Sequence, residues 1–186
     1  MTNIKKLSTP LTFDQIKDLK AGDQVTITGV IYSARDAAHK NMVDALKENK
    51  PLPIDVEGQI IYYAGPTPAK PGKVIGSCGP TTSGRMDAFS PEMMEQGLKG
   101  MIGKGPRSKA VIDSMKKNGA VYFAAIGGAA ALIADTIKKV DIVAYEELGP
   151  EAIRRMEVKD YPCIVAVDSE GNDLYQIGVE KYRVEV

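Results

Sequence analysis

The sequence predicts an α/β domain in which helices flank a mixed β-sheet. Strand-like and helix-like apolar patterns alternate along its 186 residues, and apolar residues make up 44% of the chain, enough for a substantial core. A strand pattern at 121–126 is followed by an alanine-rich helix pattern to residue 138 and by a second strand pattern at 140–145. This βαβ order favours two parallel strands. A chain of this length most simply forms one domain, residues 1–186, with a helical lead-in over residues 1–22.

The first half of the chain gives clear signals for single elements. Thr12 and Gln15 have the spacing of a capping box, which predicts the start of a short helix. Apolar residues alternate over 25–31, which indicates a strand, and helical spacing over 35–49 predicts a helix that Pro51 ends.

Further along the chain, Pro106 suits the first position of a helix and Gly119 its end. The remaining expected elements are strands at 59–64, 73–77, 163–167 and 174–178, and helices at 91–98, 106–118 and 149–156. Their sum is one mixed sheet with helices packed on it.

Composition argues against several classes of protein. Lys plus Arg equals Asp plus Glu at 24 each, and aromatic residues make up 6%, a poor match to nucleic-acid binding. No apolar run approaches the roughly 20 residues of a membrane span, and residues 1–10 lack the apolar segment of a signal peptide. The two cysteines, Cys78 and Cys163, are too few for a disulfide framework or a four-cysteine iron–sulfur site. We therefore expect a reduced, cytoplasmic protein.

Three short segments combine cationic or hydroxyl groups with turns or helix starts. In the first, Arg35 and His39 follow a strand and lie four residues apart, so a helix would present both on one face. Arg35 could meet an anion that the free N–H groups of a helix start already favour. The alternative is a solvated arginine and a packed or surface histidine, since charges in a first helical turn are common.

The second segment is Gly79-Pro80-Thr81-Thr82-Ser83-Gly84-Arg85. If the chain turns helically after the proline, Thr81 and Arg85 face the same way. Arg85 could then bind a carboxylate through two parallel hydrogen bonds while Thr81 reaches a neighbouring atom. An ordinary turn, in which Thr81 or Thr82 caps the next helix, is the alternative.

The third segment is Gly103-Lys104-Gly105, where small neighbours would let a lysine approach a ligand. Its spacing does not match a phosphate-binding P-loop, and Gly127-Gly128 lacks the spacing of a dinucleotide site. Together Arg35, Arg85 and Lys104 would supply three positive charges, which suits a small dianion such as a dicarboxylate.

Two other interpretations of these residues stay open. No general base stands out beside the cations, so a non-catalytic domain that binds carboxylates or phosphates fits the same pattern. Cys78 could act in thiol redox chemistry with Cys163, although filling space behind the loop is the more frequent role of such a cysteine.

Several segments, in order along nearly the whole chain, resemble the beta subunit or C-terminal domain of class I iron–sulfur fumarate hydratases and the related L(+)-tartrate dehydratases. The matching segments are 22–25, Ile31-Tyr32-Ser33-Ala34-Arg35-Asp36-Ala37-Ala38-His39, Gly79-Pro80-Thr81-Thr82-Ser83-Gly84-Arg85-Met86-Asp87, 103–105, 127–132 and 147–153. The two long motifs are specific, whereas the short glycine-containing pieces alone are weak.

The resemblance implies a swivelling β/β/α domain and reversible addition of water to fumarate, giving malate. The related alternative is elimination of water from L(+)-tartrate, giving oxaloacetate. In such enzymes a [4Fe–4S] cluster is held by three cysteines of an alpha part, so the implied partners are a cluster-bearing alpha subunit and a small dicarboxylate. A homo-oligomer of alpha–beta pairs is a further expectation, and this chain alone would bind no metal.

The resemblance also assigns roles to individual residues. The substrate-binding cations fall on Arg35, Arg85 and Lys104. The proposed general acid falls on Thr81, while the aspartate that acts as base belongs to the alpha part. The polar residues expected to hold these side chains in place are Asp36, His39 and Ser83.

Overall fold

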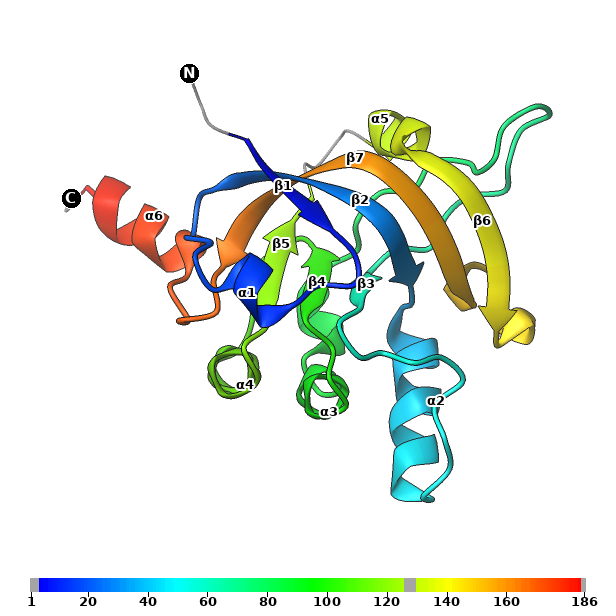
Figure 1. The fold of residues 1–186 in the computed structure, drawn as a ribbon, viewed down its shortest axis with the longest axis horizontal. Helices are drawn as coiled ribbons and strands as arrows, with labels where there is room; N and C mark the ends of the chain where they lie inside the picture. Colours follow the sequence, from blue (N-terminus) through cyan, green and yellow to red (C-terminus); the bar gives the residue numbers. More distant parts are fainter. Residues whose placement is uncertain (1–3, 126–129, 185–186) are drawn as a thin grey trace.

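The computed structural model describes residues 4–125 and 130–184, which fold around a mixed seven-stranded sheet (Figure 1). The strand order is β1-β2-β3-β4-β5-β7-β6. The bounds of the strands are β1 Lys5–Ser8, β2 Gln24–Ser33, β3 Ile60–Tyr62, β4 Gly100–Gly103, β5 Val121–Ala124, β6 Ile137–Ala144 and β7 Ile153–Val167.

An additional pairing between β2 and β7 closes five of these strands into a barrel-like sheet. Strands β2, β3, β4 and β5 run parallel, and β7 runs antiparallel to both β2 and β5. Strand β1 adds to β2, and β6 adds to β7. The long strand β7 therefore joins the two ends of the parallel series, as its arch over the molecule shows (Figure 1).

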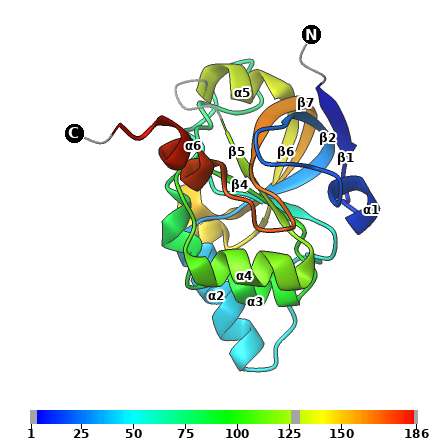
Figure 2. The same ribbon diagram turned by 90° about the vertical axis from the view of Figure 1, so that its left-hand side faces the viewer.

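Helices cover the sheet on opposite sides. Figure 2 shows α5 (Ala130–Thr136) on one side of the strands, while α2 (Asp36–Lys47), α3 (Ser90–Glu95) and α4 (Lys109–Asn118) lie on the other. Helix α6 (Leu174–Tyr182) extends away from the sheet, and the short α1 (Phe13–Ile16) precedes β2 (Figure 1). The longest helix in the described residues, α2, has 12 residues, so none of them reaches the length of a membrane span.

Two hydrophobic cores follow from the alternation of side chains along the strands. In β3, Ile60 and Tyr62 belong to the core on the inner face of the barrel, whereas Ile61 and the next residue after the strand, Tyr63, pack toward the helices. Helices α2 and α4 contribute Met42 and other apolar residues to this second core. The parallel strands are thus buried on both faces.

The predicted α/β fold with a mixed sheet and flanking helices is confirmed, and most of the predicted elements are present. Strands β5 and β6 are each antiparallel to β7 and hence parallel to one another, as expected, although β7 lies between them. The capping box is also present: the backbone N–H of Thr12 donates to Oε1 of Gln15 at 2.7 Å.

Four sequence predictions differ from the structure. Residues 153–156, predicted as helix, begin β7, and residues 174–178, predicted as a strand, lie in α6, whose first turn is capped by the side chain of Asp173. Residues 73–77 form no strand and belong to a long loop pinned by the Thr67 N–H to Ser77 C=O hydrogen bond. The helical lead-in contains α1 but begins with the strand β1.

Candidate functional site

The candidate site lies at the edge of the sheet where the parallel strands end. Arg35 comes two residues after β2, and Lys104 directly follows β4. The carboxyl ends of neighbouring parallel strands meet at one edge, which is where open α/β sheets commonly bind ligands. The segments that carry Arg35 and Lys104 therefore belong to the same edge, separated by β3.

Thr81 is joined to this edge by backbone hydrogen bonds. Its N–H donates to the carbonyl of Tyr63 at 2.8 Å, and its carbonyl accepts from the N–H of Lys104 at 3.3 Å. The N–H of Ser83 then donates to the carbonyl of Lys104 at 2.9 Å. Lys104 is consequently paired with Thr82 in a short parallel bridge, which places Thr81 directly beside it although 23 positions separate Thr81 from Lys104 in the sequence.

Arg85 is brought to the start of α2 by the 3-10 turn η1 (Ser83–Met86). Its Nη1 lies 3.9 Å from Oδ2 of Asp36, and its side chain keeps 58% of its surface exposed. Such a distant, solvated pair contributes little free energy. The guanidinium donors of Arg85 thus remain accessible beside Asp36.

Arg35 is held by a residue that the sequence analysis did not single out, Glu151 in the turn η2 (Glu146–Glu151). Oε1 of Glu151 lies 3.3 Å from Nη2 of Arg35, and Oε2 accepts the N–H of Ala37 at 3.0 Å. One carboxylate therefore positions the arginine and also accepts a free N–H group in the first turn of α2. Only the motif at 147–153 pointed toward this segment.

Arg35 is the N-cap of α2 rather than a residue of its first turn, so the expected shared helical face with His39 is not formed. The link is instead through the backbone: the N–H of His39 donates to the carbonyl of Arg35, and Nδ1 lies 2.9 Å from the same oxygen. His39 is fully buried between Tyr63 and Phe89, and burial lowers its pKa to about 4. The ring is therefore neutral at pH 7, with Nδ1 as the donor.

Several buried polar atoms at this edge have no hydrogen-bond partner among the residues that the structure describes. They are Nε of Arg35, Oδ1 of Asp36 and Nε2 of His39. Such atoms are rare because an unmade hydrogen bond costs roughly 1–3 kcal/mol. Their grouping around the first turn of α2 indicates a place that accepts a polar ligand or water.

The buried side chain of Ser83 connects two of the candidate segments, the loop of Thr81 and Arg85 and the loop of Lys104. Its Oγ lies 2.8 Å from the hydroxyl of Tyr122, and that hydroxyl donates to the carbonyl of Gly105 at 2.9 Å. Since the tyrosine proton is used there, Ser83 is the donor to Tyr122. This chain of hydrogen bonds ties the loop of Thr81 and Arg85 to the residue after Lys104.

The sequence analysis also missed a buried ion pair next to these segments. Nε of Arg107 lies 2.7 Å from Oδ1 of Asp87, and the side chain of Arg107 is completely buried. Nothing in the sequence distinguished Arg107 from a surface arginine, because its burial depends on packing between β4, α3 and α4. Gly127-Gly128, by contrast, lies outside the described residues.

The cysteines do not form the redox pair considered above. Cys78 and Cys163 are both free and buried. Burial raises the pKa of Cys78 to about 12 and also raises that of Cys163, so both are protonated thiols at pH 7. Cys78 packs in the barrel core with the hydroxyl of Tyr62 on its carbonyl, which favours the space-filling role.

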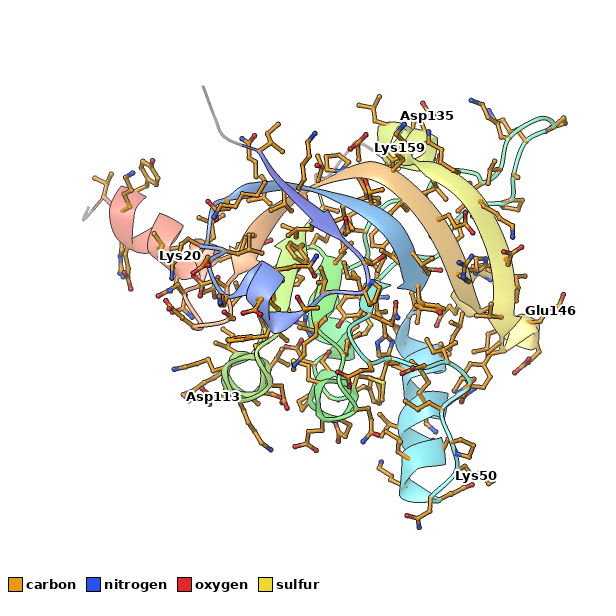
Figure 3. All side chains as sticks on the ribbon, viewed as in Figure 1. Lys20, Lys50, Asp113, Asp135, Glu146 and Lys159 are labelled. Carbon is orange, nitrogen blue, oxygen red and sulfur yellow. The ribbon has the colours of Figure 1, made fainter. Side chains whose placement is uncertain are left out.

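Charged side chains of both signs lie on the outside of the described part of the molecule. The labelled lysines and acids in Figure 3, from Lys50 at the end of α2 to Asp135 on α5, are spread around the whole perimeter. This distribution agrees with the formal net charge of zero.

The geometry thus defines an α/β domain with a barrel-like sheet that brings the segments of Arg35, Thr81, Arg85 and Lys104 to one edge. The chain belongs to the fumarase C-terminus family, whose model matches residues 2–178. It is 44% identical over 172 residues to a Methanocaldococcus jannaschii protein named "Putative L(+)-tartrate dehydratase subunit beta", covering 89% of this chain and 88% of that protein.

Similar sequences also occur inside longer proteins. The chain is 41% identical over 163 residues to "Fumarate hydratase 2" of Leishmania major and 40% identical over 164 residues to "Fumarate hydratase class I, aerobic" of Escherichia coli K12. Each match covers 87% of this chain but only 29% and 30% of these relatives. The chain therefore corresponds to one part of them, whereas it spans most of the M. jannaschii protein.

Proposed function

We propose that this chain is the beta component of a [4Fe–4S]-dependent fumarate hydratase that converts fumarate and water to (S)-malate. A separate alpha subunit would complete the site and carry the cluster. What supports this proposal is the meeting of the segments of Arg35, Thr81, Arg85 and Lys104 at one edge of the barrel, in a chain of the fumarase C-terminus family.

The cations would bind and orient the substrate. Fumarate carries a carboxylate at each end, so Arg85 and Lys104 on one loop pair and Arg35 on the start of α2 can share its two charges. Arg85 is suited to two parallel hydrogen bonds with a carboxylate, and Lys104 to a single point charge. Holding a small dianion at several points removes much of the entropic part of the barrier.

Thr81 would supply the proton. Addition of water forms a C–O bond at one alkene carbon and a C–H bond at the other. The attacking water would give its proton to the aspartate base expected on the alpha part, and the proton for the C–H bond would come from Oγ1 of Thr81. A threonine hydroxyl is a weak acid in water, but neighbouring cations and exclusion of water stabilise the alkoxide that remains. Lys104, whose backbone N–H is bonded to the carbonyl of Thr81, would be one of these cations.

The cluster cannot be ligated by cysteines of this chain alone. A [4Fe–4S] cluster needs three or four thiolates, and the chain has only two cysteines, both buried as protonated thiols. Within residues 4–125 and 130–184, no group of three His, Cys, Asp or Glu side chains is placed to hold a metal ion. The partner would therefore hold the cluster, which acts as a Lewis acid on the substrate.

A site shared between two chains would require this domain to swivel and close over a substrate held by the partner. We further propose that the two chains form a heteromer of alpha–beta pairs in the cytoplasm.

The purified chain, the cluster-loaded alpha subunit and their mixture are to be assayed with fumarate and malate. We expect turnover only in the mixture. Turnover by this chain alone would contradict the shared site, and an inactive mixture with a loaded cluster would favour a non-catalytic anion-binding domain.

A Thr81→Val variant tests the acid, because valine has the shape of threonine without the hydroxyl. Thr82→Val is the matched control, since Thr82 is the exposed neighbour in the same loop. We expect loss of turnover in the first variant and near-normal turnover in the second. Equal activities would remove Thr81 from the reaction.

A tartrate dehydratase is the second candidate, and the coverage of the M. jannaschii relative favours it. L(+)-tartrate carries one more hydroxyl than malate but the same two carboxylates, so the same cations would bind it. The mixture should therefore also be assayed with L(+)-tartrate. A kcat/KM for tartrate above that for malate would assign the chain to this activity.

A further inference from the structure

Arg107 is a fully buried arginine in the loop between β4 and α4, three residues after Lys104. Nε donates to Oδ1 of Asp87 at 2.7 Å, Nη2 donates to Oγ of Ser90 at 2.8 Å, and Nη1 lies 3.4 Å from Sδ of Met101. Each guanidinium nitrogen therefore has a partner, and two of these partners lie directly after the loop of Thr81 and Arg85.

The planar head of Arg107 also lies against two tyrosine rings. Its Cζ is 5.4 Å from the ring centroid of Tyr63 and 5.0 Å from that of Tyr122. These rings belong to the residues that hold the candidate loop: the carbonyl of Tyr63 binds the N–H of Thr81, and the hydroxyl of Tyr122 binds Ser83. Contacts between a guanidinium and aromatic faces strengthen when they are desolvated.

Two partners of Arg107, Asp87 and Ser90, make further hydrogen bonds to the backbone of the two loops. Oδ2 of Asp87 accepts the N–H of Ser108 at 2.7 Å, so this carboxylate joins the loop after η1 to the loop after Lys104 twice. Ser90 Oγ also donates to the carbonyl of Met86, the last residue of η1. The cluster of Arg107, Asp87, Ser90, Tyr63 and Tyr122 thus fixes one loop against the other.

Stability alone is a weak reason to bury such a charge. Removing an ion pair from water is unfavourable for both ions, and well-packed apolar residues often replace buried pairs without loss of stability. A guanidinium, however, fixes geometry in a plane through several directed bonds. The hydrogen-bond partners of Arg107 lie just after the loop of Thr81 and Arg85, at Asp87 and Ser90, and in the strand that leads to Lys104, at Met101.

We propose that Arg107 is a positioning residue: it sets the loop of Thr81 and Arg85 at the correct distance and angle from Lys104 for a dicarboxylate. This inference rests on the proposed hydro-lyase function. A buried side chain that does not touch the substrate would thus fix the relative position of the loops that bind it.

The test uses Arg107→Lys, which keeps the charge but loses the planar fork, and Asp87→Asn, which keeps the shape but loses the charge. Arg155→Lys is the matched control, since Arg155 pairs with Glu157 on β7. Hydrogen exchange of the backbone amides of Thr81 and Ser83 is measured in the full chain. We expect exchange at least tenfold faster in both variants than in the control, with amides of α2 unchanged.

The second measurement is kinetic and uses the complex with the alpha subunit. Displaced cations bind a dicarboxylate less well, so the KM for fumarate should rise about tenfold in addition to any fall in kcat. A residue that only supports folding would reduce the amount of active enzyme, which lowers the apparent kcat and leaves KM unchanged.

The two measurements separate two kinds of failure. Unchanged exchange at Thr81 and Ser83 in both variants, or faster exchange with an unchanged KM, would overturn the positioning role. A wild-type complex that turns over neither fumarate, malate nor tartrate would overturn the proposed function, and with it this role in catalysis. The exchange rates would still show whether Arg107 orders the loop.

Discussion

Two arginine–aspartate pairs in neighbouring regions show opposite uses of the same chemistry. At the strand edge, Arg85 and Asp36 are 3.9 Å apart with side chains 58% and 38% exposed. Behind that edge, Arg107 and Asp87 are 2.7 Å apart with side chains 0% and 17% exposed. A loose, solvated pair can exchange its partner for a ligand at little cost, whereas a tight, desolvated pair cannot. The comparison teaches that proximity of opposite charges is informative only together with their exposure.

The largest expected effect is on activity at the exposed pair. Arg85→Ala should lower kcat/KM of the alpha–beta complex about a thousandfold, as loss of a directed contact to developing negative charge does elsewhere. The midpoint of thermal unfolding should stay within about 2 °C, because the surface pair contributes little stability. Steady-state kinetics and calorimetry check both parts, with Arg155→Ala as the control. Near-normal kinetics would remove Arg85 from the site.

Substitution in the buried pair should mainly lower the free energy of unfolding. Arg107→Met leaves Asp87 charged and partly buried, and we expect the free energy of unfolding to fall by at least about 3 kcal/mol. Asp36→Asn at the exposed pair should lower it by less than about 1 kcal/mol. Urea titrations of the two variants measure the difference. Similar losses in both variants would show that the buried pair contributes no more to stability than the exposed pair.

The single histidine gives a pH prediction that sharpens the same contrast. Below its ordinary pKa of 6.5 the unfolded chain binds a proton at His39, but the folded chain does not until about pH 4. Stability from this group is therefore complete above about pH 6.5 and is lost as the pH falls toward 4, by about 2 kcal/mol at pH 5 relative to pH 7. Urea unfolding at both pH values measures it. The His39→Gln variant should lack this part of the pH dependence, and an identical dependence in both proteins would contradict the assignment.

The smallest expected effect concerns the hydroxyl of Tyr122. Tyr122→Phe leaves the carbonyl of Gly105 and Oγ of Ser83 without their buried partner, at a cost of about 1–2 kcal/mol in unfolding free energy. Tyr182→Phe, at a residue that is 74% exposed, should cost nothing measurable. Adding Ser83→Ala to Tyr122→Phe should restore part of the loss, since the unsatisfied serine is removed. Fully additive losses in the double variant would argue against a direct bond.

The elements that the sequence predicted well are those with local signals. The capping box at Thr12 and the helical spacing of α2 depend on residues within a few turns, and both are present in the structure. Strand β4 was missed because two of its four residues are glycines, which have low strand propensity. Only the last residues of strand β7, 163–167, were predicted as a strand. The rest of β7 carries Arg, Lys, Glu and Pro, which suit only a strand that is partly exposed along its length.

The residues of the candidate site likewise fall into those with local sequence signals and those without. Arg35, Thr81, Arg85 and Lys104 stand in motifs visible in the sequence, and their roles stay predictions until the proposed assays are made. Glu151 and Arg107 were missed because their significance arises from partners that are 116 and 20 positions away in the chain. Such partners are fixed by the sheet order, which no local pattern encodes. Closure of the barrel by β2 and β7 was not predicted for the same reason.

The late position of β7 in the chain has a consequence for synthesis. This strand bonds to β2, β5 and β6, yet it emerges from the ribosome only after all three of them. Until then, a nascent chain exposes one hydrogen-bonding side of β2 and one of β5, and such unpaired edges invite association with other chains. Polypeptides stalled before residue 153 should therefore require chaperones, whereas those stalled well beyond residue 167 should not.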